Sequence, residues 1–327
     1  MVASGRVYGT MTARVAITPP MTRGSGMTCL PIDPWIPAVK CSRYLTPTTA
    51  LMALGGYAAI CGMVYLRQQT ILYRPAKANA QTPPSDLVLV ANEHIPSING
   101  WVDNPGQPLA LIYFGGASEP IELRREALAK AFPNHTRYLL PYRGFGPNSH
   151  LLPDETAIKE DAMRLVAHVT SQHQGVHVIG RSLGTGMALH VAAAYPVLAL
   201  GLITPYDSIL EVARRSYRWL PVAKILRDRF ESWRDASRVH APILTCLAEV
   251  DKVITPSRTQ ALLRHLPNYP DCCTIAGSNH RTIAQQDELW TALSTFFKAH
   301  TPEVSSKVKR VIKGAGVSRG RLRVAGA

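Results

Sequence analysis

Short apolar runs alternate with stretches of helical spacing over most of this chain, and this alternation limits the possible folds more than any other feature. The expected strands are residues 87–91, 109–114, 137–140, 176–179, 198–204, 242–250 and 271–275. The expected helices are residues 119–132, 154–172, 183–194, 255–266 and 282–300. Strands and helices in this order form a mostly parallel sheet with helices on both faces. The sequence therefore predicts one α/β domain over residues 70–300.

Residues 207–240 interrupt this alternation. They contain Trp219, Trp233 and many arginines but no long apolar run. We expect a small helical insert, or cap, over the carboxyl edge of the sheet. This insert is either a lid that forms one wall of the substrate site or a surface segment without a role in binding. The sequence leaves both interpretations open.

The net charge of +14 comes from 36 Lys and Arg against 22 Asp and Glu, and it is concentrated at the ends of the chain. Residues 1–46 carry +4 and residues 304–327 carry +7, which leaves only +3 for residues 47–303. A basic end can touch phosphate or anionic lipid through electrostatics alone. The division predicts a flexible basic arm over 1–46, a disordered basic tail over 301–327 and no specific nucleic-acid partner.

The 19 residues 48–66 contain no charged side chain. A transmembrane helix needs about 20 mostly apolar residues. We therefore predict a single-pass N-terminal membrane anchor over residues 47–67, with a buried helix or a signal-peptide core as the alternatives. Lys40 and Arg67 place positive charge on both sides, so the orientation of the catalytic domain stays undecided.

The six cysteines show neither a C-x-x-C pair nor a spacing with histidines that is typical of zinc sites. They give no disulfide framework and no indication of the compartment. The sequence thus predicts no metal site.

The segment Gly180-Arg181-Ser182-Leu183-Gly184 matches G-x-S-x-G between an expected strand and an expected helix. In this setting the serine lies on a sharp, strained turn, and the glycines avoid the clashes that side chains would make there. The turn presents the serine hydroxyl at the carboxyl end of the sheet, where open α/β folds bind ligands. Ser182 is therefore the predicted nucleophile.

A serine nucleophile needs a base, and the base needs a carboxylate that orients it. His280 and Asp251 each follow an expected strand, so both should reach the same edge of the sheet as Ser182. His177 and His190 flank the serine and are interpreted as structural. Asp207 is the rival acid, because it follows the strand that ends at 204; its structural alternative is to cap a helix that starts near residue 209.

Two backbone amides are the candidates for stabilising an oxyanion. Leu183 opens the helix after the nucleophile, where N–H groups have no intrahelical partner. The second donor should come from the loop after the strand 109–114, where Gly115, Gly116 and Ala117 stand. We predict the Gly116 amide, with Ala117 next; a role of these glycines in the turn alone is the alternative.

These motifs together resemble a known family. The Gly115-Gly116 loop, PYRGFG at 141–146, GRSLG at 180–184, TPYDSI at 204–209, AEVDKVITP at 248–256 and GSNH at 277–280 follow one another as in α/β-hydrolase-domain proteins that carry an N-terminal membrane anchor and a short cap. These are related to serine aminopeptidases and monoacylglycerol-lipase-like hydrolases. The resemblance covers residues 70–300 and departs at Phe114-Gly115-Gly116, where many relatives have His-Gly-Asn.

The resemblance implies an α/β-hydrolase fold, a Ser182–Asp251–His280 triad, no cofactor, and an ester, thioester or lipid-like acyl substrate. Tyr142 and Arg143 are expected to shape the floor of the site. A serine peptidase with the same triad is one alternative function. A non-catalytic, membrane-associated scaffold is the other, although the intact triad argues against it.

Overall fold

The computed structural model describes residues 46–74, 85–89, 96–302 and 322–324. All of the predicted arm except residue 46, and most of the predicted tail, lie outside these residues. The chain divides into two compact units, Met1–Ala50 and Leu51–Ala327. Only residues 46–50 of the first unit are described, and they form the start of a helix, so the description below concerns the second unit.

A nine-stranded sheet forms the centre of the second unit, in the order β8-β7-β6-β5-β3-β4-β2-β1-β9. Strands β3 to β8 pair in parallel, whereas β2 is antiparallel to both β1 and β4. The strands are β1 (Leu87–Leu89), β2 (Ile98–Asp103), β3 (Leu109–Phe114), β4 (His135–Leu139), β5 (Gly175–Arg181), β6 (Ala199–Ile203), β7 (Ile243–Val250), β8 (Asp271–Asn279) and β9 (Leu322–Val324). The predicted mostly parallel sheet is thus confirmed.

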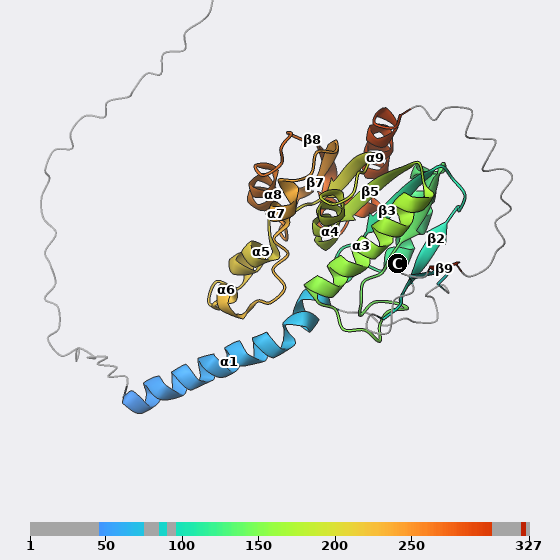
Figure 1. Cartoon of the computed structure of the whole chain (residues 1–327). Helices are drawn as coiled ribbons and strands as arrows, with labels where there is room; N and C mark the ends of the chain where they lie inside the picture. The colour runs from blue at the N-terminus through green and yellow to red at the C-terminus, as the bar shows by residue number, and fades with distance from the viewer. Residues whose placement is uncertain (1–45, 75–84, 90–95, 303–321, 325–327) are drawn as a thin grey trace, which may run out of the picture. The chain divides into compact units, whose positions relative to one another are not determined.

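Helices cover both faces of this sheet. The helices of the body are α2 (Arg125–Ala131), α3 (Glu155–Gln172), α4 (Leu183–Ala192), α8 (Pro256–Leu263) and α9 (Asp287–Ala299), with short 3-10 helices at Ile121–Arg124 and Ile283–Gln285. Side chains from α3, α4 and α8 share one apolar core, and those from α2 and α9 share a second. Figure 1 shows α3 and α4 in front of the strands. Strand β3 lies between both cores, which explains its unbroken apolar sequence.

Two buried histidines lie near the amino ends of their strands. His135 Nε2 is 3.0 Å from His177 Nδ1, and the His177 ring stacks on Phe297 with centroids 4.4 Å apart. Burial lowers the pKa of His135 to about 4 and that of His177 to about 3. Both rings are therefore neutral at pH 7, which fits the structural role predicted for His177.

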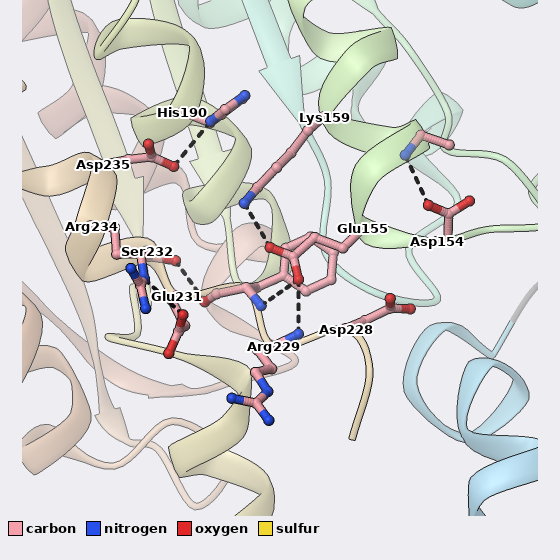
Figure 2. A network of polar contacts seen from close by, with 12 residues as sticks. Asp154, Glu155, Lys159, His190, Asp228, Arg229, Glu231, Ser232, Arg234 and Asp235 are labelled. Atoms are coloured by element: carbon pink, nitrogen blue, oxygen red, sulfur yellow. Dashed lines mark hydrogen bonds and ion pairs between the residues drawn. The ribbon is translucent and has the colours of Figure 1, made fainter. Parts of the chain in front are cut away.

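The insert over residues 207–240 contains three short helices: α5 (Ile209–Ser216), α6 (Val222–Ile225) and α7 (Ser232–Ala236). The segment between α6 and α7 is held by one carboxylate of α3. Glu155 Oε2 accepts hydrogen bonds from the backbone N–H groups of Arg229 and Phe230 at 2.8 and 2.9 Å (Figure 2). Asp235 also lies 3.0 Å from His190 of α4 (Figure 2). The cap is thus fastened to α3 and α4, and His190 has the structural role expected of it.

Helix α1 (Pro47–Tyr73) is longer than the predicted anchor. It is the one helix in the described part of the chain that is long and apolar enough to cross a membrane. The last turns of α1 extend beyond the predicted end because their side chains form hydrogen bonds with the cap. Gln68 donates to the Ile225 carbonyl at 3.1 Å and accepts the Arg227 N–H at 2.7 Å, and the Tyr73 hydroxyl lies 2.9 Å from Asp228 Oδ2.

Candidate active site

Ser182 lies between β5 and α4 in a backbone conformation that side chains rarely adopt, with φ 49° and ψ −117°. The turn is so tight that a Cβ at Gly180 would overlap the Gly184 carbonyl, and a Cβ at Gly184 would overlap the Phe114 carbonyl. Both glycines of the motif are therefore required for helix α4 to approach β3 and β5 closely. The strained turn places Ser182 at the carboxyl end of the sheet.

The structure brings the three predicted triad side chains together. Ser182 Oγ is 2.9 Å from His280 Nε2, and His280 Nδ1 is 2.7 Å from Asp251 Oδ2. Asp251 follows β7 and His280 follows β8, so adjacent parallel strands deliver both groups to the same edge as Ser182. Asp251 Oδ1 accepts the N–H groups of Val253 and Ile254 at 2.8 and 2.7 Å, which fixes the carboxylate.

The rival acid has another partner. Asp207 Oδ2 is 3.0 Å from Arg258 Nη1, and no hydrogen bond joins Asp207 to His280 in the described structure. Burial raises the pKa of Asp207. Nor does Asp207 cap α5, because the Ser208 hydroxyl accepts the N–H of Glu211 at 3.1 Å. Asp207 thus holds Arg258 and plays neither of the roles considered from the sequence.

The two predicted oxyanion donors differ in availability. The Leu183 N–H lies in the first turn of α4 and has no hydrogen-bond partner among the described residues. The Gly116 loop adjoins the nucleophile, since a Cβ at Gly116 would be 3.4 Å from Ser182 Cβ. However, the Gly116 N–H donates to Glu119 Oε2 at 2.7 Å. The next amide, that of Ala117, has no such partner within the described ranges.

Glu119 is the centre of a buried polar cluster that sequence reasoning missed. Its carboxylate, with a side chain 4% exposed, lies 3.0 Å from Arg181 Nη1 and 3.2 Å from Arg124 Nε and accepts the Tyr113 hydroxyl at 3.1 Å. Arg181 also donates to the His280 carbonyl at 2.8 Å. The cluster therefore links the Gly116 loop to the histidine loop.

Neighbouring acidic groups keep the buried Arg181 charged. Burial is the largest single effect on Arg181 and opposes its ionisation, but Glu119, Tyr113 and Asp251 together outweigh burial, so the pKa of Arg181 is raised. The available signal in the sequence was Arg181 itself, since an arginine between a buried strand and a buried helix requires a partner. The sequence did not indicate which acid supplies it.

Tyr142 supports the same loop from another direction, because its hydroxyl donates to the Gly115 carbonyl at 2.8 Å. Arg143 instead pairs with Asp161 of α3 at 2.7 Å. Among the described residues, no group of three His, Cys, Asp or Glu side chains is arranged to hold a metal ion.

Comparison with known proteins gives the fold. No family model matches the chain. Two curated relatives, each an uncharacterized protein of Mycobacterium tuberculosis (strains CDC 1551 / Oshkosh and H37Rv), are 26% identical over 230 residues, which cover 66% of this chain and 81% of each relative.

Two solved structures are similar to this chain. The structure of Est1E from Butyrivibrio proteoclasticus with bound ferulic acid is 16% identical, with a TM-score of 0.52, over 62% of this chain and 95% of that one. MGS-M2, an α/β hydrolase enzyme from a Medee basin deep-sea metagenome library, is 15% identical, with a TM-score of 0.51, over 67% and 99%. The chain has the α/β-hydrolase fold, as predicted.

Proposed function

We propose that this protein is a serine hydrolase that cleaves carboxylic ester, thioester or lipid-like acyl substrates through an acyl-enzyme. The observation that carries the proposal is the hydrogen-bonded chain from Ser182 Oγ to His280 Nε2 and from His280 Nδ1 to Asp251 Oδ2. A hydroxyl is a weak nucleophile at neutral pH, and an adjacent imidazole held by a carboxylate is the arrangement that activates it.

In the proposed reaction, Ser182 Oγ attacks the acyl carbonyl while His280 Nε2 takes the hydroxyl proton. The imidazolium then gives this proton to the leaving alcohol or thiol as its bond to the acyl carbon breaks. Water attacks the acyl-enzyme with His280 again as base, which releases the carboxylic acid and restores Ser182. Asp251 stabilises the imidazolium, and the N–H groups of Val253 and Ile254 keep the Asp251 carboxylate oriented.

The oxyanion is held in this proposal by the Leu183 amide and by the loop after β3. Because the Gly116 N–H is bound to Glu119, the Ala117 amide is the better second donor. Gly116 then serves as the glycine that lets the loop lie against Ser182. Removing one such donor costs on the order of 10²–10³ in turnover.

A lipid-like substrate is favoured by helix α1, whose apolar surface is exposed from Leu51 to Ile60. We propose that this helix attaches the protein to a membrane and so brings the site to acyl substrates there. The structure of Est1E, a protein with the same fold, holds a carboxylic acid, the kind of product that ester cleavage releases.

The proposal is tested by turnover of p-nitrophenyl esters of increasing chain length by the full chain in detergent. Ser182→Ala should lower kcat by up to ~10⁶-fold. Ser171→Ala, an exposed serine near the end of α3, is the matched control and should keep full turnover. Equal activity of the Ser182→Ala and Ser171→Ala proteins would refute the proposal.

A further inference from the structure

The cap contacts α1 inside the apolar part of that helix. The Tyr57 hydroxyl donates to the Trp219 carbonyl at 2.8 Å. Farther along α1, Cys61 and Val64 pack against a small apolar cluster of the cap built from Leu210, Leu220 and Val222. These contacts follow one face of the helix and accompany those of Gln68 and Tyr73.

The position of Tyr57 decides how this helix can meet a bilayer. Tyr57 lies in the middle of the uncharged stretch 48–66. At 1.5 Å per residue, only about 15 Å of helix lies between Pro47 and Tyr57. The hydrocarbon core of a bilayer is ~30 Å thick, about twice that length. A bilayer that enclosed the whole uncharged stretch 48–66 would therefore also reach the cap.

The part of the cap that would meet it is the segment 214–224, here called the cap loop. It includes the last turn of α5 and the start of α6. Its two large aromatic side chains face solvent: Tyr217 is 40% exposed and Trp219 is 58% exposed. Tyrosine and tryptophan are enriched where a membrane meets water, because one part of each ring is apolar and the other is polar.

The cap loop also carries cations that no acid of the described structure neutralises. Arg215, Arg218 and Lys224 are exposed and form no ion pair there, whereas Arg214 is paired with Glu211. Arg67, on the exposed side of α1, adds a further unpaired charge. Exposed cations beside exposed aromatic rings suit a surface of lipid phosphates.

We propose that the cap loop rests on the surface of an anionic phospholipid bilayer, with the Leu51-to-Tyr57 end of α1 inserted in the adjoining leaflet. The inference rests on the proposed membrane attachment through α1 and is independent of the hydrolytic activity. In this arrangement Trp219 lies at the headgroup level and the arginines bind phosphates. The cap, which follows the carboxyl end of β6, thereby faces the membrane.

The test measures whether lipid quenches Trp219. The full chain is reconstituted into vesicles of phosphatidylcholine and phosphatidylglycerol, with or without bromine on the lipid acyl chains close to the headgroup. We expect brominated lipid to quench wild-type tryptophan emission and Trp219→Phe to remove the quenched component. This substitution leaves the carbonyl that binds Tyr57 intact. Trp233→Phe, in α7 of the same cap, is the matched control and should leave the quenched component in place.

The role of charge is tested in the same vesicles. Each basic residue near an anionic surface contributes about a fivefold preference, equivalent to ~1 kcal/mol. Quenching of Trp219 should therefore be stronger with phosphatidylglycerol than with phosphatidylcholine alone. The variant Arg215→Gln/Arg218→Gln/Lys224→Gln should abolish that difference, while Arg234→Gln, which removes an arginine paired with Glu231, should preserve it.

The outcomes separate this inference from the proposed α1 anchor and from the proposed hydrolase activity. Unquenched Trp219 in protein that floats with the vesicles would overturn the cap-loop contact and leave the α1 anchor standing. Unquenched Trp219 in a cross-linked dimer would assign this surface to a second copy of the chain instead. Protein that does not float would refute the anchor and the cap-loop contact together. Ester turnover in the same samples reports on the hydrolase separately.

Discussion

Replacing Glu119 by Ala tests whether the buried cluster beside the triad holds the site together. The substitution leaves Arg181 and Arg124 without their counter-charge and the Gly116 N–H without its acceptor. Removing one partner of a buried ion pair typically costs ~3–5 kcal/mol, because the other charge stays buried and uncompensated. The Glu119 side chain is 4% exposed and that of Arg181 is 10% exposed, so solvent screening reduces this cost little.

The assay is urea unfolding followed by circular dichroism, combined with ester kinetics on the folded protein. Glu119→Ala should lower the free energy of unfolding by ~3–5 kcal/mol. Glu119→Gln keeps an acceptor for Gly116 and should lose less. In Glu119→Gln, kcat should fall by a larger factor than KM rises. The reason is that the Gly116 loop and the His280 carbonyl, which the Glu119 cluster links, lose their fixed geometry.

The control is Glu231→Ala, which removes the partner of an arginine that is 63% exposed and should cost less than ~1 kcal/mol. If Glu119→Ala proves as harmless as Glu231→Ala and leaves kcat unchanged, the cluster has no positioning role.

Further predictions concern the acid of the triad, the buried histidines and the tight turn at Ser182. Asp251→Asn should lower kcat by ~10⁴-fold, because the imidazole of His280 loses the group that orients it. The kcat of Asp207→Asn should be at least a hundredfold higher than the kcat of Asp251→Asn. Equal losses of kcat in ester assays would contradict the choice of Asp251 as the acid of the triad. His135 and His177 have folded pKa values of about 4 and about 3, so the unfolded chain binds protons below pH 6.5 that the native state does not. Their stabilising effect is complete above pH 6.5 and should be lost as the pH falls through 4 towards 3, at a cost of about 3 kcal/mol for each ring by pH 4. In urea titrations against pH, the double variant His135→Gln/His177→Gln should show a flatter acid limb, and an unchanged limb would contradict the assignment. Gly184→Ala should destabilise the fold by more than ~3 kcal/mol, because its Cβ would overlap a carbonyl of β3, and a melting temperature within a few degrees of wild type would contradict this packing.

The sequence predicted the parts of the site that follow from strand order. Ser182, Asp251 and His280 each come directly after a strand of the sheet, and parallel strands bring such loops to one edge. Both ends of β3 were predicted correctly, because a strand that is buried on both faces has a continuous apolar sequence. The helix after β3 was predicted as one element, but the structure divides it into a 3-10 turn and α2.

Other features depend on contacts that local patterns do not contain. Strand β2 was not predicted, because its Asn99 and Gly100 interrupt any apolar run, and its pairing with β1 and β4 defines it. The Gly116 amide was expected to be free, and only the fold shows that Glu119 turns back to bind it. Hydropathy predicted that the helix over 47–67 ends at residue 67. In the structure α1 continues to Tyr73, because Gln68 and Tyr73 form hydrogen bonds with the cap.

Covalent labelling tests whether Ser182 is a nucleophile activated by His280. The full chain is treated with a fluorophosphonate probe, digested, and the modified peptide is identified by mass spectrometry. We expect modification at Ser182, none in Ser182→Ala, and strongly slowed labelling in His280→Ala. A folded wild-type chain that is not labelled, or a label on another serine, would contradict this role of Ser182.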